Sequence, residues 1–362
     1  MKEKVAVAMS GGVDSSVCAL CLHEQGYQVT GVFWTGMCSG AGQDEAWADV
    51  QMVGKKLGIV VEKLDIGEQK SKLVDYMISY YQDGLTPNVC SWCNRWVKFG
   101  FFYNWALERG FDKIATGHYA RVKINQDGQA YLYTAVDKKK DQTYFMALAE
   151  VDWLRVLLPL GEWHKSQVRD KARAGGLPMA DKPESMEVCF MHGLGLGEFL
   201  DDFVEEKPGE IVVETEDRIR VVGQHSGLSR YTIGQRQGLQ IQPESNQTPV
   251  YYVKAKDRVS NRLIVGVKDD LATCTLKVTL VGDKMALMVR ERQNLVGWYV
   301  RWRHQGRLLP IKEIRAEKDG GCLVELKEAA WAVAPGQIAV FYQKDERMTD
   351  DYWCLGGGEI VE

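Results

Sequence analysis

Residues 10–16 read Ser10-Gly11-Gly12-Val13-Asp14-Ser15-Ser16, and this stretch decides how the N-terminal part of the chain is expected to fold. The apolar run Val5–Met9 before it predicts a buried strand. The run Val17–Leu22 after it predicts a helix with Asp14 or Ser15 as N-cap. Two adjacent glycines at such a junction leave several backbone N–H groups free to point at one anion, and the helix dipole strengthens that field. The stretch therefore predicts a phosphate-binding loop, and an ordinary strand–turn–helix corner is the alternative.

Segments of strand and helix character alternate through the first 120 residues. They predict strands over 28–34, 60–64 and 113–116, and helices over 44–57, 70–81 and 94–109. Such alternation is typical of a doubly wound parallel α/β sheet, which binds ligands at the carboxyl ends of its strands. The loops after Met9, Trp34 and Thr116 are therefore expected to share one rim of the sheet.

The pattern changes after residue 120. We expect a β-hairpin over 121–136 that turns at 126–128, helices over 151–158 and 165–174, and a helix near 197–205. From residue 208 onward the chain consists of short β-like runs separated by turn residues, which is typical of small β domains. The sequence therefore predicts an α/β domain over 1–207, a small β-rich domain over 208–271 and a β-barrel over 272–362.

Composition places the chain among globular proteins. Of its 362 residues, 45% are hydrophobic and 26% are charged. It has no run of about 18 apolar residues and no basic–apolar leader, so we expect a cytoplasmic protein without a membrane partner. Nine cysteines in such a chain favour reactive thiols, metal ligands or buried side chains over a disulfide scaffold.

Positive charge is concentrated in one part of the chain. Residues 218–315 contain 18 Lys and Arg against 7 Asp and Glu, although the whole chain has a formal net charge of −4. A local surplus of this size is typical of a surface that binds nucleic acid. A mixed, solvated surface is the alternative.

Two cysteines three residues apart, Cys90 and Cys93, lie at a predicted junction between a loop and a helix. A helix N-terminus lowers the pKa of a nearby thiol, which suits a nucleophile. The same spacing suits a metal ion or an iron–sulfur cluster, for which Cys189 is a candidate third ligand. A pair of half-buried cysteines without a task is the alternative.

Seven motifs occur in an order that resembles the bacterial-type tRNA-specific 2-thiouridylase (MnmA/TrmU) family, and the resemblance spans nearly the whole chain. They are SGGVDSS at 10–16, TPNVCSWCN at 86–94, ATGHYAR at 115–121, KDQTYF at 140–145, MEVCF at 186–190, YTIGQRQGL at 231–239 and NRLIVG at 261–266. The first motif by itself resembles the pyrophosphate loop of PP-loop ATP pyrophosphatases, which have an adenine nucleotide alpha-hydrolase-like fold.

The resemblance implies a reaction and a set of site residues. ATP, with Mg2+, adenylates the 2-oxygen of the wobble uridine in the anticodon stem-loop of tRNA, and sulfur then displaces AMP to give 2-thiouridine. Cys93 takes the place of the nucleophile and Cys189 that of the cysteine carrying a persulfide, which a cysteine desulfurase or sulfur relay protein would load. The implied nucleotide contacts are Ala8, Met9, Ser10, Gly11, Gly12, Val13, Asp14, Ser15, Trp34 and Gly117. The implied tRNA contacts are Asn88, Val89 and Cys90 at the target base, and His118, Lys140, Asp141, Gln142, Arg301, Trp302 and Gln337 elsewhere.

The chain departs from the family pattern at one place. The usual segment TPNPDxxCN has Val89 in place of its second proline and Cys90 in place of its aspartate. Cys90, Cys93 and Cys189 therefore also resemble the three ligands of a [4Fe–4S] cluster in several other tRNA thiolation enzymes, and this alternative stays open. A PP-loop synthetase that acts on a small molecule is a further alternative. Trp92 would either support a flipped uridine or pack in the core, and His118 would either contact tRNA or complete a strand end.

Overall fold

The computed structural model describes residues 2–361 apart from 38–40, 125–127, 184–187, 192–193, 216–217, 242–248, 292–294, 319 and 347–350. Its helices are α1 (Val13–Glu24), α2 (Ala41–Leu57), α3 (Gly67–Gln82), α4 (Val89–Cys93), the π-helix η1 (Asn94–Phe101), α5 (Phe102–Glu108), α6 (Thr143–Met146), α7 (Lys165–Ala174), α8 (Leu196–Asp201) and α9 (Asp283–Glu291). Its strands are β1 (Lys4–Met9), β2 (Gln28–Thr35), β3 (Val60–Asp65), β4 (Lys113–Ala115), β5 (Ala120–Ile124), β6 (Ala130–Thr134), β7 (Val156–Leu157), β8 (Gly209–Thr215), β9 (Arg218–His225), β10 (Tyr252–Asp257), β11 (Arg262–Gly266), β12 (Ala272–Val281), β13 (Trp298–Arg301), β14 (Leu309–Ala316), β15 (Gly321–Trp331), β16 (Ile338–Lys344) and β17 (Tyr352–Ile360).

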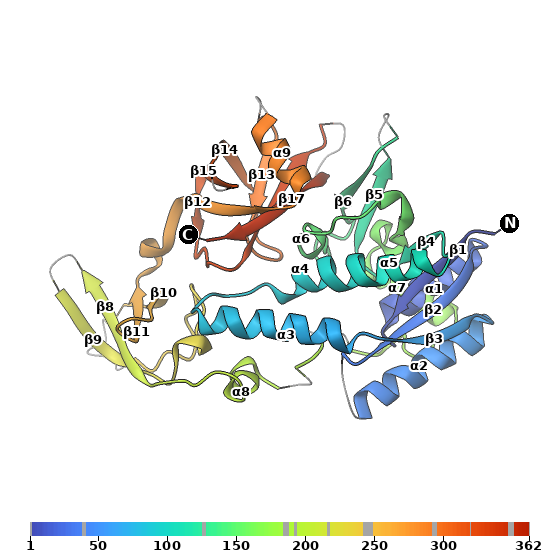
Figure 1. Ribbon diagram of the computed structural model, residues 1–362, viewed down its shortest axis with the longest axis horizontal. Coiled ribbons are helices and arrows are strands. Elements are labelled where there is room, and N and C mark those ends of the chain that lie inside the picture. The colour runs from blue at the N-terminus through green and yellow to red at the C-terminus, as the bar shows by residue number, and fades with distance from the viewer. Residues whose placement is uncertain are drawn as a thin grey trace.

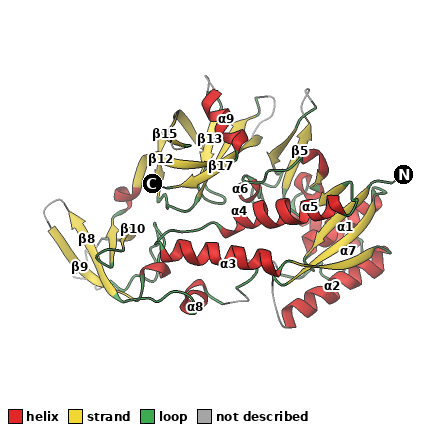
Figure 2. Ribbon diagram, viewed as in Figure 1, coloured by secondary structure: helices red, strands yellow, loops and turns green. Residues whose placement is uncertain are grey.

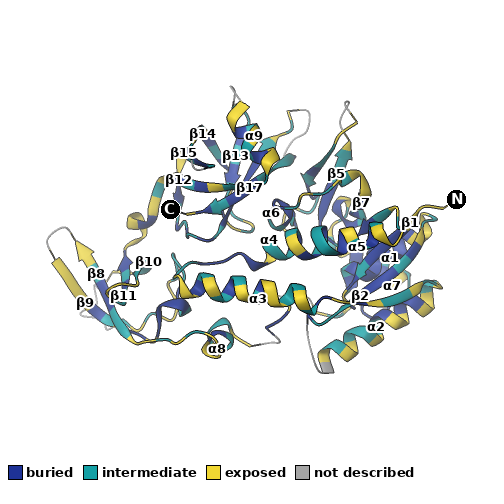
Figure 3. Cartoon of the chain, viewed as in Figure 1, coloured by how far each residue is buried: buried dark blue, intermediate teal, exposed yellow. Residues whose placement is uncertain are grey.

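The first sheet is parallel and doubly wound, as predicted. Its strand order is β3-β2-β1-β4-β7, and helices cover both faces (Figures 1 and 2). Alternate side chains of strand β1 point to opposite faces of the sheet, and each face packs against its own layer of helices. Val5 and Val7 pack with α1, α2 and α7, whereas Ala6 packs with α3, η1 and α5. All three are fully buried, and Figure 3 shows this sheet as the buried centre of the domain.

Two predicted helices in this domain have a different form. The segment 151–158 is a short 3-10 turn, Trp153–Arg155, followed by β7, so the helix expected there is wrong. Asp152 caps the turn by accepting from the N–H of Leu154 at 3.0 Å, and Val156 then pairs with Ile114 of β4. The segment forms a strand because its backbone pairs with the edge of β4. This pairing depends on the tertiary structure, so the helical spacing of its side chains did not predict it.

The helix expected over 94–109 begins as the π-helix η1 and continues as α5. Gly100 lies so close to the preceding turn that a Cβ there would be 2.6 Å from the backbone oxygen of Arg95. π-Helical turns are rare and are frequent at functional sites. This one immediately follows the two cysteines of the predicted thiol site.

The rest of the chain is β-rich, as predicted. Strands β10-β11-β8-β9 form a small sheet, and β12-β15-β14-β13-β16-β17 form a barrel that closes where β12 pairs with β17. The small sheet and the α/β domain lie at opposite ends of the molecule in Figure 1, with the barrel above the middle. No helix in the described ranges is both long and apolar enough to cross a membrane.

The hairpin predicted over 121–136 exists as β5 and β6, although its turn at 126–127 lies outside the described residues. It adds to the barrel sheet, because Tyr133 of β6 pairs with Trp353 of β17. The hairpin therefore joins the α/β domain to the C-terminal barrel. Sequence order alone assigned it to the first domain.

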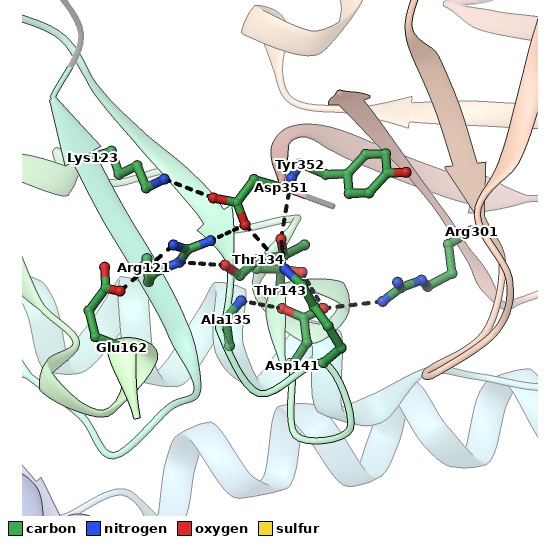
Figure 4. A network of polar contacts seen from close by, with 11 residues as sticks. Arg121, Lys123, Thr134, Ala135, Asp141, Thr143, Glu162, Arg301, Asp351 and Tyr352 are labelled. Atoms are coloured by element: carbon green, nitrogen blue, oxygen red, sulfur yellow. Dashed lines mark hydrogen bonds and ion pairs between the residues drawn. The ribbon is translucent and has the colours of Figure 1, made fainter. Parts of the chain in front are cut away.

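A buried ion pair reinforces this junction (Figure 4). The carboxylate of Asp351 accepts from Arg121 at 2.5 Å and from Lys123 at 3.0 Å, and the side chains of Asp351 and Arg121 are 8% and 6% exposed. Burial works against ionisation of Asp351, but the hydrogen bonds from Arg121, Lys123 and Lys138 outweigh it and lower its pKa to about 2. The carboxylate is therefore charged across the physiological range.

We expect Asp351→Asn to lower the free energy of unfolding by about 3 kcal/mol at neutral pH, because it leaves buried Arg121 with the exposed carboxylate of Glu162, 3.7 Å away, as its anionic partner. A lowered folded-state pKa stabilises the protein above the unfolded pKa of about 4, and this stabilisation is lost as the pH falls towards about 2. Urea unfolding of wild type and variant at several pH values measures the difference. Lys138→Met removes a half-exposed partner of Asp351 and should lower the free energy of unfolding by less than about 1 kcal/mol. Equal losses in both variants at every pH would contradict the prediction.

Candidate active site

The glycine-rich loop forms the turn between β1 and α1. Gly11 has a φ of +78°, and a Cβ there would lie 2.7 Å from the backbone oxygen of Ala46. Helix α1 begins at Val13 with Gly12 as its N-cap, so the expected cap at Asp14 or Ser15 is wrong. Gly12 has no side chain to occupy the first N–H groups, which therefore stay available to an anion.

Asp14 is held by two residues from elsewhere in the domain. Both of its carboxylate oxygens accept from the ammonium of Lys165, at 2.7 and 2.8 Å, and one also accepts from the hydroxyl of Tyr119 at 2.7 Å. Lys165 begins α7, and its side chain is 12% exposed. The loop lacks the lysine of a Walker motif, and α7 brings a cation to it from 151 residues away. Sequence spacing gave no signal for this residue.

The other predicted nucleotide contacts lie on the same rim, because β1, β2 and β4 are adjacent and parallel. Gly117 follows β4 and packs directly on the loop: a Cβ there would be 2.8 Å from the backbone of Asp14 and Ser15. Trp34 lies at the end of β2, and its indole nitrogen is buried with no hydrogen-bond partner among the described residues. A polar atom of this kind is left for a ligand or water.

The predicted thiol site is built on α4. Asn88 caps this helix by accepting from the backbone N–H of Ser91 at 3.1 Å, and Asn88 and Val89 are buried. Cys90 is exposed and Cys93 is partly buried. Trp92 packs against the rings of Tyr76 and Trp96, with centroids 5.7 and 4.7 Å away, and these two rings also contact each other.

The predicted lowering of the thiol pKa is wrong. Desolvation by the protein atoms around each thiol raises the pKa of Cys93 to about 12 and also raises that of Cys90, although part of each residue stays accessible and the ammonium of Lys98 acts in the opposite direction on both. Helix α4 continues directly into η1, and Cys93 is its fifth residue, past the first turn in which the field of a helix terminus acts, so that field does little to offset this loss of solvation. Both thiols are therefore protonated in the free protein at neutral pH, and Lys98 is the group that favours their ionised forms.

Lys98 also joins the thiol site to the nucleotide rim. Its ammonium lies 3.1 Å from Nε2 of His118, whose Nδ1 lies 2.7 Å from the hydroxyl of Thr116. Burial and the nearby Lys98 charge hold the pKa of His118 well below its usual range. The neutral ring therefore accepts from Lys98 at Nε2 and donates from Nδ1 to Thr116. His118 follows Gly117, so two consecutive residues contact the phosphate loop and the lysine of the thiol site.

Lys98→Met should raise the pKa of both thiols, because it removes the cation that stabilises their thiolates. Below the thiol pKa, each unit of increase lowers the thiolate fraction by about tenfold. The rate of iodoacetamide alkylation of the peptide holding Cys90 and Cys93, followed by mass spectrometry against pH, measures this effect. Lys98→Arg keeps the charge and should stay close to wild type. The same pH profile in Lys98→Met and wild type would contradict the assignment.

Cys189 lies near α4, because its neighbours Val188 and Phe190 pack in the same hydrophobic cluster as Trp92 and Cys93. At this position its charged form raises the pKa of Cys90 and Cys93. It is exposed, and the eight cysteines that the structure describes form no disulfide. The described residues include no group of three or more His, Cys, Asp or Glu placed to hold a metal ion. The three thiols are thus neighbours that are not arranged as a ligand set. Cys38 lies outside the described residues.

Several residues expected to contact tRNA lie between the α/β domain and the barrel. Asp141 is 2% exposed and accepts from Arg301 at 3.2 Å (Figure 4), and Trp302 is 5% exposed. Gln337 donates to the backbone oxygen of Thr86 at 2.9 Å, three residues before α4 begins. The remaining two are Lys140, which is partly exposed, and Gln142, which accepts from the N–H of Tyr119 at 2.9 Å. The arrangement brings these residues from distant segments to the side of the thiol helix.

Three family models match the chain in succession. They are the tRNA methyl transferase HUP domain over residues 3–193, the tRNA methyl transferase PRC-barrel domain over 197–267 and the aminomethyltransferase beta-barrel domain over 277–360. Among curated proteins, the tRNA-specific 2-thiouridylase MnmA of Pelobacter propionicus is 40% identical, with 99% of this chain and 97% of that protein aligned. The MnmA of Picosynechococcus sp. is also 40% identical over 99% and 98%, and that of Enterococcus faecalis is 35% identical over 99% and 95%.

The parallel sheet, its glycine-rich loop and the β-rich domains that follow define a PP-loop α/β protein, which confirms the predicted fold class. The identities extend over nearly the full length of the chain and of its relatives. The chain belongs to the MnmA family of tRNA-specific 2-thiouridylases, and the family resemblance of its seven motifs is confirmed.

Proposed function

We propose that this protein is a tRNA 2-thiouridylase, which uses ATP to replace the 2-oxygen of the wobble uridine by sulfur. One observation carries the proposal: Gly117 packs on the phosphate loop while the next residue, His118, contacts the lysine beside the thiols. A base held between them would reach both an ATP phosphate and a sulfur nucleophile. We also propose domain boundaries at 207/208 and 271/272.

The first step is adenylation. The uridine 2-oxygen attacks the α-phosphate of ATP, the bond between the α and β phosphates breaks, and pyrophosphate leaves. The N–H groups at the start of α1 would hold the phosphates, with Lys165 supplying a cation close to them. Asp14 is the one carboxylate in the loop and its oxygens already accept from Lys165, so Mg2+ would be held chiefly by the phosphates of ATP. The ion would neutralise phosphate charge.

The second step is sulfur transfer. The outer sulfur of a persulfide on Cys189 attacks C2 of the adenylated base, and AMP leaves with the former 2-oxygen. The Cys93 thiolate then attacks Cys189 Sγ, which forms a Cys93–Cys189 disulfide and leaves the outer sulfur on the base. The raised pKa of Cys93 means that a proton must first leave, and Lys98 favours that ionisation. An external thiol then reduces the disulfide.

The partners follow from this chemistry. tRNA would lie over the basic region 218–315, with its anticodon loop at α4. The sulfur comes from a cysteine desulfurase or a relay protein, and we propose that the enzyme works in the cytoplasm.

The test uses purified protein with ATP, unmodified tRNA and a desulfurase-generated sulfur source. Nucleoside mass spectrometry should detect 2-thiouridine, with AMP release that depends on tRNA. AMP release that does not need tRNA, without thiolated nucleoside, would point instead to a small-molecule synthetase. Loss of 2-thiouridine in a deletion strain, restored by the wild-type gene, is the matching observation in cells.

A [4Fe–4S] route is a second candidate, because Cys90 and Cys93 have the spacing of cluster ligands and Cys189 lies near them. The described thiols are not arranged to hold a metal, so we derive no step through a cluster.

The Cys90→Ala variant separates the two routes. With the persulfide route, its thiolation rate should stay within about threefold of wild type, because Cys90 neither carries sulfur nor forms the disulfide. Iron in anaerobically purified wild type, combined with a loss of about a hundredfold or more in the variant, would favour the cluster.

A further inference from the structure

Asn88 orients the helix that carries two of the active-site thiols. Its side-chain oxygen accepts from the backbone N–H of Ser91 at 3.1 Å, which caps α4. Its side-chain nitrogen donates to the hydroxyl of Tyr144 at 3.2 Å. Asn88 is buried and uses both ends of its amide, so the cap depends on Tyr144 as well as on α4.

The hydroxyl of Tyr144 continues this series of contacts into the barrel. It lies 3.1 Å from the backbone oxygens of both Trp302 and Ile338. A phenol has one proton, which Tyr144 shares between these carbonyls while its oxygen accepts from Asn88. Burial raises the pKa of Tyr144, so it remains a neutral donor. Because its side chain is fully buried, water does not replace these contacts.

The backbone just before Asn88 contacts the same part of the barrel. The N–H of Thr86 donates to the oxygen of Pro335 at 2.9 Å, and the Gln337 side chain donates to the oxygen of Thr86 at 2.9 Å. Gly336 packs so closely that a Cβ there would lie 2.9 Å from the Thr86 oxygen. A displacement of this barrel segment therefore displaces the start of the thiol loop.

We propose that Tyr144 is a positioning residue that couples the C-terminal barrel to the orientation of α4. The inference rests on the proposed function in one respect, since Arg301, Trp302 and Gln337 are expected tRNA contacts. tRNA bound at those residues shifts the carbonyl of Trp302. The shift reaches the thiol helix through the hydroxyl of Tyr144 and the amide of Asn88.

Tyr144→Phe tests the coupling by removing one oxygen atom. Hydrogen–deuterium exchange of the backbone amides of 89–94 in the free protein should rise about tenfold, the scale of one lost side-chain hydrogen bond. With tRNA, kcat for thiolation should fall by about the same factor while KM for tRNA stays within about twofold, because the contacts to RNA remain.

Tyr342→Phe is the matched control. Tyr342 is fully buried at the same interface, and its hydroxyl contacts Thr143 at 3.1 Å. The Tyr342→Phe variant should lower the free energy of unfolding about as much as Tyr144→Phe does. Its amide exchange at α4 and its kcat for thiolation should equal those of wild type.

Equal exchange at 89–94 in Tyr144→Phe and Tyr342→Phe would overturn the proposal, whatever the activity. Faster exchange in Tyr144→Phe together with an unchanged kcat would also overturn it. Absence of thiolation by the wild type, with the exchange difference present, would instead contradict the proposed function and leave the positioning role supported.

Discussion

Cys93→Ser is expected to abolish tRNA thiolation, with a loss of about a thousandfold or more, the scale seen when a catalytic nucleophile is removed. A serine hydroxyl does not ionise near neutral pH and does not attack a sulfur–sulfur bond, so sulfur stays attached to Cys189. Adenylation uses the phosphate loop instead and should continue. Single-turnover formation of 2-thiouridine, measured by mass spectrometry beside AMP release, separates the two steps.

Cys274→Ser is the control for this variant, because Cys274 is an exposed thiol on β12. Its thiolation rate should equal that of wild type. The assignment of Cys93 would be contradicted by a serine variant that keeps more than about a tenth of the wild-type single-turnover rate. Loss of AMP release together with thiolation would place Cys93 in adenylation or in folding rather than in sulfur transfer.

Gly11→Ala should weaken ATP binding by about a hundredfold. The residue has a φ of +78°, and its Cβ would meet the backbone oxygen of Ala46 at 2.7 Å. Left-handed strain and this clash together cost about 1–3 kcal/mol, which the loop relieves by changing shape and losing its aligned N–H groups. Calorimetric titration with a non-hydrolysable ATP analogue measures the affinity.

Gly26→Ala is the control, because it introduces a similar backbone strain at a position away from the phosphate loop. Gly26 has a φ of +89°, but a Cβ there meets nothing within 4 Å, and it lies at the far end of α1. This variant should lose about 1 kcal/mol of stability and keep its ATP affinity. Similar ATP affinities for the two alanine variants would show that Gly11 has no special role in the phosphate loop.

Features set by neighbouring residues were predicted well. The turn at Gly11 and Gly12 follows from two adjacent glycines between an apolar run and a helix, and the common rim follows from the topology of parallel strands. The helix start was misplaced by two or three residues, because the cap lies at Gly12 and not at Asp14 or Ser15. A serine or aspartate is the usual cap, but here the cap position has no side chain.

The electrostatics of the thiol site were predicted incorrectly, because they depend on burial. The sequence places Cys93 near a helix start, which by itself lowers a thiol pKa. In the fold, the surrounding side chains remove water from the thiol, and Cys93 lies past the first turn of its helix, where the field of the helix terminus is too weak to offset that loss. Lys98 and Lys165 were missed for a related reason. A lone lysine gives no pattern, and its role appears when the chain brings it to His118 or Asp14.

The phosphate loop, the parallel sheet and the order of domains are encoded locally, by glycine placement and by hydrophobic periodicity within single segments. Folding adds the contacts between distant segments: Lys165 on Asp14, the β5–β6 hairpin on the barrel, and Tyr144 between Asn88 and the carbonyls of the C-terminal domain. These contacts join residues that lie 56 or more positions apart in the chain. Solvation and hydrogen bonding at each site are set by their geometry, so a linear pattern does not reveal them.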